Sequence, residues 1–267
     1  MPATPIRPAR LAPEPPTNHK PLLPVVVVAS YKGGTGKTAL SVALAERLAW
    51  AGLRVLLITC DSQEDARHRL GIDGSERAAA QRHYGSRGSL TVVGLRGSQA
   101  VDVLYRTGPQ SNGLQEFDLA VVDTPPEIRG GSLPGVTMIA TVDGTDAARN
   151  LITMLRQTPT NTRVILVAIG EGDAREWIKN ARAIEAAAGR ELGCLGQPLP
   201  RSPQVKDAHD EGKSVWSLRR AGRTLAFLNG VETLARIAWE LCNDDDELPT
   251  MPPSSSAVPY VPGWDDE

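Results

Sequence analysis

The sequence has few cysteines and few aromatic residues. Three cysteines, Cys60, Cys194 and Cys242, are scattered among 267 residues without a CxxC pair. This spacing argues against a disulfide framework, a structural zinc site or an iron–sulfur cluster, and it fits a reducing cytoplasm. Aromatic residues make up 4% of the chain, so stacking on the bases of a single strand is not expected. All apolar runs fall far below the roughly 18 residues that a membrane-spanning helix needs.

Prolines and charge separate the two ends of the chain from its middle. Residues 1–22 and 243–267 together hold 12 of the 21 prolines. The first segment has a net charge of +2 and the second of −7, which leaves +3 for residues 23–242 out of a total of −2. We therefore predict one folded domain over 23–242, flanked by a disordered Pro-rich tail and a disordered acidic tail. The net charge of the whole chain is negative because of the acidic tail, although the predicted domain itself is slightly basic.

Short β-branched runs alternate with amphipathic stretches along the predicted domain. Strands are expected at 25–30, 54–60, 91–95, 119–122, 137–142 and 163–169. Helices are expected at 39–51, near 98–105, and at 146–156, 173–188 and 223–242, with a helical stretch ending near residue 70. Residues beyond it, up to 88, are polar and predict no clear element. The alternation indicates an α/β fold: a three-layer, mainly parallel twisted sheet with helices on both faces, as in P-loop NTPases.

The strongest local signal is a glycine-rich loop between a buried strand and an amphipathic helix. Residues 32–38 read Lys-Gly-Gly-Thr-Gly-Lys-Thr. Glycines let successive backbone N–H groups turn inward around the β- and γ-phosphates of a nucleotide, and the following helix adds its positive N-terminal end. The pattern predicts a phosphate-binding loop in which Lys37 supplies a positive charge and the Thr38 hydroxyl a ligand for Mg²⁺.

The loop departs from the ordinary pattern GxxxxGK[ST], because the first glycine of that pattern would fall at Tyr31. It carries an additional lysine, Lys32, at its start. Lys32 and Lys37 cannot serve the same phosphate oxygens without crowding. We therefore predict that Lys32 leaves its own loop and neutralises phosphate charge on a neighbouring subunit.

With three further motifs, this loop resembles the deviant Walker A motif of the ParA/MinD family of ATPases, most of all the short plasmid-type ParA partition ATPases. Residues 56–63 (LLITCDSQ) are similar to the second strand of the family, which ends in an Asp followed by Pro-Gln. Residues 117–126 (FDLAVVDTPP) look like its Walker B segment. Residues 199–213 align without gaps to the family's Pro-Arg…Gly-Lys stretch. The resemblance implies ATP and Mg²⁺ as ligands.

The resemblance also assigns roles to single residues. It implies that Asp61 positions or activates the attacking water and that Asp123 holds the Mg²⁺ shell through water. For either aspartate, the N-cap of a helix is the alternative role. The catalytic set is then Lys32, Lys37 and Asp61. The implied nucleotide-binding set is Lys32, Gly33, Gly34, Thr35, Gly36, Lys37, Thr38, Ala39, Pro200 and Arg201.

A basic cluster lies between residues 201 and 223 and is a candidate surface for DNA phosphates. In ParA proteins the non-specific DNA surface forms in the ATP-bound dimer, partly from this region. Gln204 stands where a DNA-contacting Arg is common in the family. A solvated basic face without a DNA role is the alternative. The candidate DNA-binding residues are Lys206, Lys213, Arg219, Arg220 and Arg223.

These features lead us to expect a ParA-type ATPase that dimerises on ATP, binds double-stranded DNA non-specifically, and partitions or positions a plasmid, a chromosome or another cargo. Slow hydrolysis would be stimulated by a ParB-like or other adaptor, in the cytoplasm and associated with the nucleoid. The alternative is an ATP-dependent recruitment module of a DNA-transfer or secretion machinery, docking through the aromatic tail 258–267. A MinD-like membrane-positioning ATPase is less favoured, because the C-terminal segment is acidic and Pro-broken rather than basic and amphipathic.

Overall fold

The computed structural model describes residues 20–30, 34–60, 65–72, 80–84, 88–95, 97–106, 113–124, 133–243 and 260–261. Within these residues, nine strands form one twisted sheet in the order β3-β4-β2-β5-β1-β6-β7-β8-β9. Neighbouring strands are parallel except at the two edges, where β3 pairs with β4 and β9 pairs with β8 in antiparallel fashion. The strands are β1 (Val25–Ala29), β2 (Arg54–Thr59), β3 (Ala80–Tyr84), β4 (Gly88–Gly94), β5 (Leu119–Asp123), β6 (Thr137–Val142), β7 (Arg163–Ala168), β8 (Gly193–Leu195) and β9 (Tyr260–Val261).

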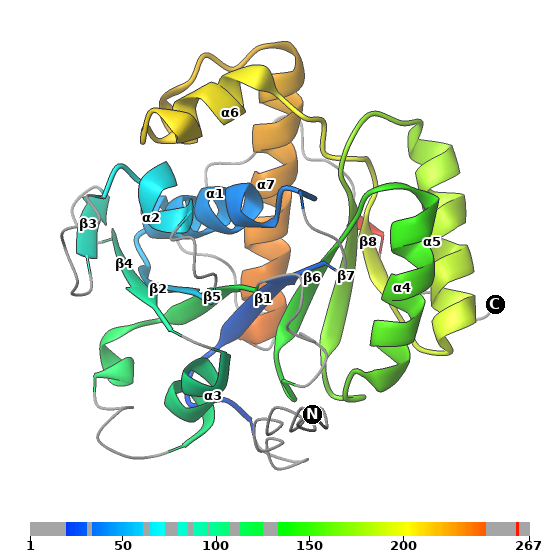
Figure 1. The fold of residues 1–267 in the computed structure, drawn as a ribbon, viewed down its shortest axis with the longest axis horizontal. Coiled ribbons are helices and arrows are strands. Elements are labelled where there is room, and N and C mark those ends of the chain that lie inside the picture. The colour runs from blue at the N-terminus through cyan, green and yellow to red at the C-terminus, as the bar shows by residue number, and fades with distance from the viewer. Residues whose placement is uncertain are drawn as a thin grey trace, which may run out of the picture.

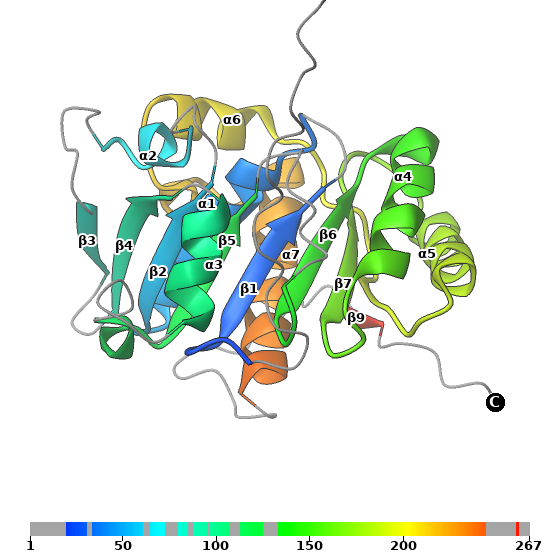
Figure 2. The same cartoon turned by 60° about the horizontal axis from the view of Figure 1, so that its bottom comes forward.

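Helices cover both faces of this sheet, which confirms the predicted three-layer α/β architecture (Figures 1 and 2). The described helices are α1 (Lys37–Trp50), α2 (Asp65–Arg69), α3 (Gly97–Tyr105), α4 (Gly144–Gln157), α5 (Ala174–Ala188), α6 (Pro203–Asp210) and α7 (Gly222–Cys242). Short 3₁₀ turns occur at Leu114–Glu116 and Val215–Ser217. The helices α1, α2, α6 and α7 lie on one face, and α3, α4 and α5 lie on the other.

The central strand β1 shows why its residues form a buried strand. Val26 and Val28 pack into the core beneath α1 and α7, whereas Val25 and Val27 pack into the core beneath α3, α4 and α5. Side chains alternate between the faces of a strand, so a strand with helices on both sides needs an unbroken apolar run. The glycine-rich loop follows the carboxyl end of β1 and leads directly into α1.

The two predicted tails are only partly described. The N–H of Leu22 donates to the carbonyl of Leu104 at 2.8 Å, which ties the start of the described chain to α3. Tyr260–Val261, which we placed in the acidic tail, form β9 and pair with Leu195 and Cys194 of β8. The rest of both tails lies outside the described residues.

We expect Gly88→Ala to destabilise the fold by about 3 kcal/mol, because a Cβ at this position would overlap backbone that cannot move away. An ideal Cβ on Gly88 lies 1.8 Å from the carbonyl oxygen of Ala49 at the end of α1. Gly94, at the other end of β4, is a matched control, because its Cβ position has no atom of the described residues within 4 Å other than those of its chain neighbours. Urea unfolding should separate the two variants. Equal unfolding free energies would contradict the close packing of β4 against α1.

Candidate functional site

The glycine-rich loop joins the carboxyl end of β1 to the first turn of α1. Gly34 and Gly36 have φ angles of +73° and +77°, the left-handed region that favours glycine. Apart from its chain neighbours, no atom of the described residues lies within 4 Å of the Cβ position of Gly34, and the nearest to that of Gly36 is Ile169 Cγ2 at 3.9 Å. The backbone conformation therefore requires these glycines, and the space beside them is open. Lys32 and Gly33 lie outside the described residues.

The loop is anchored to the neighbouring strand β6. Thr35 is fully buried, and its hydroxyl lies 3.2 Å from the hydroxyl of Thr141, which donates to it. Lys37, the first residue of α1, is 6% exposed, while Thr38 and Ala39 are half-buried. The predicted phosphate-binding residues from Gly34 to Ala39 thus occupy the loop and the first turn of the helix.

Asp123 lies at the carboxyl end of β5, beside the same turn of α1. Asp123 is 1% exposed, and its carboxylate accepts a 3.1 Å hydrogen bond from the hydroxyl of Ser41. Ser41 also contacts the carbonyl of Lys37 at 3.0 Å, so one side chain joins the aspartate to the start of the helix. The sequence analysis missed Ser41, although a serine one turn after a Gly-Lys-Thr motif is the signal that could have found it.

The strand that precedes Asp61 ends next to Asp123. Asp61 itself lies outside the described residues, but the N–H of Cys60 donates to the carbonyl of Asp123 at 3.0 Å. Burial, together with the nearby Asp123 carboxylate, raises the pKa of the Cys60 thiol to about 12. Cys60 therefore stays protonated and acts as a small, half-buried side chain, as expected for a cysteine outside a metal or redox motif.

A cavity of about 530 Å³, here called the loop cavity, is lined by residues of the loop, of α1 and of α6. Gly34, Gly36 and Ala39 line it together with Pro200 and Arg201. The structure thus brings together the two parts of the predicted nucleotide-binding set, which are more than 150 residues apart in the sequence. The Arg201 guanidinium is 61% exposed and donates to the carboxylate of Asp143 at 2.6 Å.

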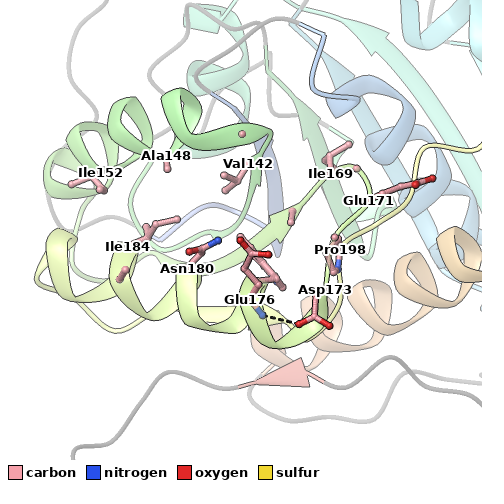
Figure 3. A pocket seen from close by; sticks show the side chains of 16 residues that line it. Val142, Ala148, Ile152, Ile169, Glu171, Asp173, Glu176, Asn180, Ile184 and Pro198 are labelled. Carbon is pink, nitrogen blue, oxygen red and sulfur yellow. Dashed lines mark hydrogen bonds between the residues drawn. The ribbon is translucent and has the colours of Figure 1, made fainter.

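A second cavity of about 410 Å³ lies between α4 and α5 (Figure 3). Its walls are mainly apolar, with Glu171, Asp173 and Glu176 as its acidic residues and no Lys, Arg or His among the lining residues. Asp173 caps α5, because its carboxylate accepts from the N–H groups of Arg175 and Glu176 at 2.9 and 3.0 Å. This cavity offers no cation for phosphate and shares only Ile169 with the loop cavity.

The predicted DNA-binding residues lie around α6 and the start of α7, and most are paired with acids. Arg223 pairs with Glu171, and Arg219 has no acidic partner among the described residues. The other three pairs are Lys206–Asp210 at 2.7 Å, Lys213–Glu211 at 2.6 Å and Arg220–Glu232 at 3.8 Å. These pairs reduce the net positive potential of this surface.

Gln204 has a structural role that sequence reasoning missed. Its side-chain oxygen accepts from the Thr224 hydroxyl at 2.6 Å and from the Ser202 hydroxyl at 3.3 Å. Ser202 in turn caps α6 and lies 2.8 Å from Thr224 in α7. Gln204 therefore ties the start of α6 to the start of α7. Its position in the sequence gave no sign of this, because Thr224 lies 20 residues away.

Within the part of the chain that the structure describes, no group of three or more His, Cys, Asp or Glu side chains is arranged to hold a metal ion. The same residues include no helix that is both long enough and apolar enough to cross a membrane.

Comparison with known proteins points to one family. The profile described as "CobQ/CobB/MinD/ParA nucleotide binding domain" matches residues 26–215. The chain is 53% identical over 47 residues to the cell division protein PomZ of Myxococcus xanthus, covering 18% of this chain and 15% of PomZ. It is 31% identical over 132 residues to the virulence plasmid ParA family protein pGP5-D of Chlamydia muridarum, covering 40% of this chain and 49% of that protein. The chain thus spans at most about half the length of these two relatives.

Solved structures share the fold at low sequence identity. A McdA variant from Cyanothece in complex with ATP superposes with a TM-score of 0.59 at 15% identity, covering 81% of this chain and 96% of that one. MinD from Aquifex aeolicus superposes with a TM-score of 0.54 at 20% identity, covering 79% and 96%.

Proposed function

The chain belongs to the CobQ/CobB/MinD/ParA nucleotide-binding domain family, and we propose that it is a ParA-type ATPase that positions or partitions DNA or another cargo. One observation carries this proposal: the glycine loop and the Pro200-Arg201 segment line one cavity, and the buried Lys37 and Asp123 lie at the adjacent first turn of α1. A phosphate site at a helix N-terminus, next to the carboxyl ends of parallel strands, is where open α/β sheets bind nucleotides. The similarity to pGP5-D and PomZ supports a role in partition or positioning.

The residues present fit a nucleotide. Gly34 and Gly36 are exposed and left-handed, so their backbone N–H groups would turn toward phosphate oxygens, and Lys37 would supply a positive charge at the helix start. Pro200 and Arg201 line the same cavity and would hold the adenosine part. The ATP in the McdA complex is a property of that protein, and it supports ATP as the nucleotide here.

The oxygen atoms of Thr38 and Asp123 fit a magnesium ion, because Mg²⁺ prefers oxygen ligands and keeps several waters. Thr38 would bind it directly, and Asp123 would hold one of its waters. When bound, the ion neutralises charge that develops on the phosphates during transfer. Ser41 keeps the Asp123 carboxylate oriented by its 3.1 Å hydrogen bond.

Asp61 and Lys32 complete the proposed cycle. Asp61 follows Cys60, whose backbone N–H bonds to the carbonyl of Asp123, and Asp61 would orient the attacking water. Lys32 would contact the phosphates of a second subunit, so that ATP holds a dimer together. An adaptor protein would stimulate the slow hydrolysis and release the dimer.

Co-sedimentation with double-stranded DNA tests the proposal. We expect binding with ATP and Mg²⁺ but not with ADP, and a loss of affinity of about tenfold or more between 50 and 200 mM salt, since the contacts would be to phosphates.

Lys32→Ala should keep ATP binding, because Lys37 remains, and lose both the ATP-dependent dimer and DNA binding. Normal ATP-dependent dimers in this variant would remove Lys32 from the subunit interface.

The recruitment module remains a second candidate, and the acid-paired basic surface favours it. Four of the five candidate DNA-binding residues are paired, and Gln204 is held by Thr224. This candidate predicts ATP-dependent binding to a protein partner that is lost when residues 258–267 are deleted, with no DNA binding in either nucleotide state.

A further inference from the structure

The second cavity, between α4 and α5, is a mainly apolar groove with acidic residues around it (Figure 3). Val142, Ile152 and Ile184 are among its apolar lining residues. Among the described residues that line it, every charged side chain is an acid. Binding surfaces are complementary in charge as well as in shape. A ligand of this cavity, from here on called the acidic groove, therefore combines apolar groups with positive charge.

Two of the three acids in the acidic groove already have partners. Glu171 pairs with Arg223, and the carboxylate of Asp173 accepts from two N–H groups at the start of α5. Glu176 is exposed and makes no salt bridge with another described residue. Figure 3 shows it beside Asn180, on the side of α5 that faces α4. Glu176 is therefore the carboxylate that the groove offers to a cation, and the Asn180 amide can bond to a peptide backbone.

The N-terminal part of the sequence contains a segment of complementary chemistry, outside the described residues. Residues 5–11 read Pro-Ile-Arg-Pro-Ala-Arg-Leu, with two positive charges and no acid. A polyproline II helix has three residues per turn, so residues three apart share a face. In that conformation Pro5 and Pro8 would share an apolar face, and Arg7 and Arg10 would share a basic one. Segments with prolines three apart dock in apolar grooves, because this helix is pre-formed at low entropic cost.

We propose that residues 5–11 of the same chain dock in the acidic groove, with the prolines on its apolar floor and Arg10 at Glu176. Tethering gives such a segment an effective concentration in the millimolar range, so a weak site is enough to hold it. Docking covers an apolar surface that would otherwise be open to association. A partner that uses this groove has to displace the segment first.

The course of the chain after this segment fits the proposed occupant. The Cα of Lys20 lies 3.5 Å from the Cβ position of Gly135, in the turn before β6. Leu23 packs in the core beneath α3, α4 and α5, so the chain enters on the face of the sheet that carries the groove. From that turn, β6 leads over about 20 Å to Val142 in the groove. The chain from Arg10 to Lys20 spans about 31 Å as a polyproline II helix, which is long enough.

Photo-cross-linking in the full chain tests the proposal. The photoreactive residue p-benzoylphenylalanine replaces Leu11, next to Arg10, and mass spectrometry of the digested protein locates the cross-links. We expect them in peptides that contain residues 148–152 of α4 or 177–184 of α5. The yield should not change on dilution, because the docking is intramolecular.

Charge reversal tests the contact between Arg10 and Glu176. Glu176→Lys should lower the yield about fivefold, since it replaces an exposed ion pair by a repulsion, and Arg10→Glu should do the same. The double variant with both changes should restore the yield. Glu191→Lys is the matched control, because Glu191 is an exposed acid just beyond α5 that does not line the groove, and it should leave the yield unchanged.

Three results would overturn the proposal. The first is a set of cross-links confined to other parts of the chain, or a yield that Glu176→Lys leaves unchanged. The second is a yield that falls on dilution, with cross-links between isotopically labelled and unlabelled copies, since the segment would then occupy a second copy. The third is a double variant that stays as weak as the single ones, because the losses would then not arise from a contact between Arg10 and Glu176.

Discussion

Replacing Lys37 by alanine should weaken ATP binding by about 100-fold or more while leaving the protein folded. Two unit charges 4 Å apart attract each other by about 4 kcal/mol at the effective dielectric constant of a protein surface, and burial keeps solvent from screening them. Lys37 is 6% exposed and is the first residue of α1, directly after the glycine loop. Alanine has the highest helix propensity, so the first turn of α1 should form without the lysine.

Equilibrium binding of ATP, with circular dichroism to verify the fold, measures this effect. Lys179→Ala is a suitable control, because Lys179 is an exposed lysine on α5 and lines neither described cavity. It should change the affinity less than twofold. If Lys37→Ala bound ATP as the wild type does, the loop from Gly34 to Thr38 would not be the phosphate site.

The central elements could be predicted because local requirements, such as burial on both faces of a strand or a positive φ angle, determine which residue types they contain. The run Val25–Ala29 must be apolar at every position, since helices pack on both faces of β1. The glycine loop could be identified for the same reason, because positive φ angles at Gly34 and Gly36 require that residue type. Strands β6 and β7 were likewise predicted to within one residue of their observed bounds.

The elements that the sequence analysis missed depend on distant partners. Strand β3 (Ala80–Tyr84) is mostly polar, because it lies at the edge of the described sheet and pairs there with β4 alone. Helix α6 begins at Pro203 after the capping Ser202, a local signal that was present, but its eight residues are stabilised by contacts with α2 and α7. The acidic groove gave no motif at all, because its lining residues come from β6, α4, β7 and α5 and meet only in the fold.

Asp61→Ala should lower ATP hydrolysis by about 100-fold or more, which is the usual contribution of a group that orients or deprotonates the nucleophile. ATP binding should be retained, because Lys37 and the glycine loop hold the phosphates. The dimer would then persist on DNA, since its release follows hydrolysis. The expected result is a variant that co-sediments with DNA in ATP and is not released by time or by an adaptor.

Asp65→Ala provides the matched control for this variant. Asp65 is an exposed aspartate in the first turn of α2, only four residues beyond Asp61, so its loss changes the charge of the same region without removing the proposed catalytic group. Phosphate release should remain near the wild-type rate in this control. Unchanged hydrolysis in Asp61→Ala would assign Asp61 to capping a helix and would mean that another residue positions the water. An equal loss of hydrolysis in both variants would contradict a catalytic role for Asp61. It would indicate a general effect of negative charge in this region, because the two aspartates carry the same charge and differ only in position.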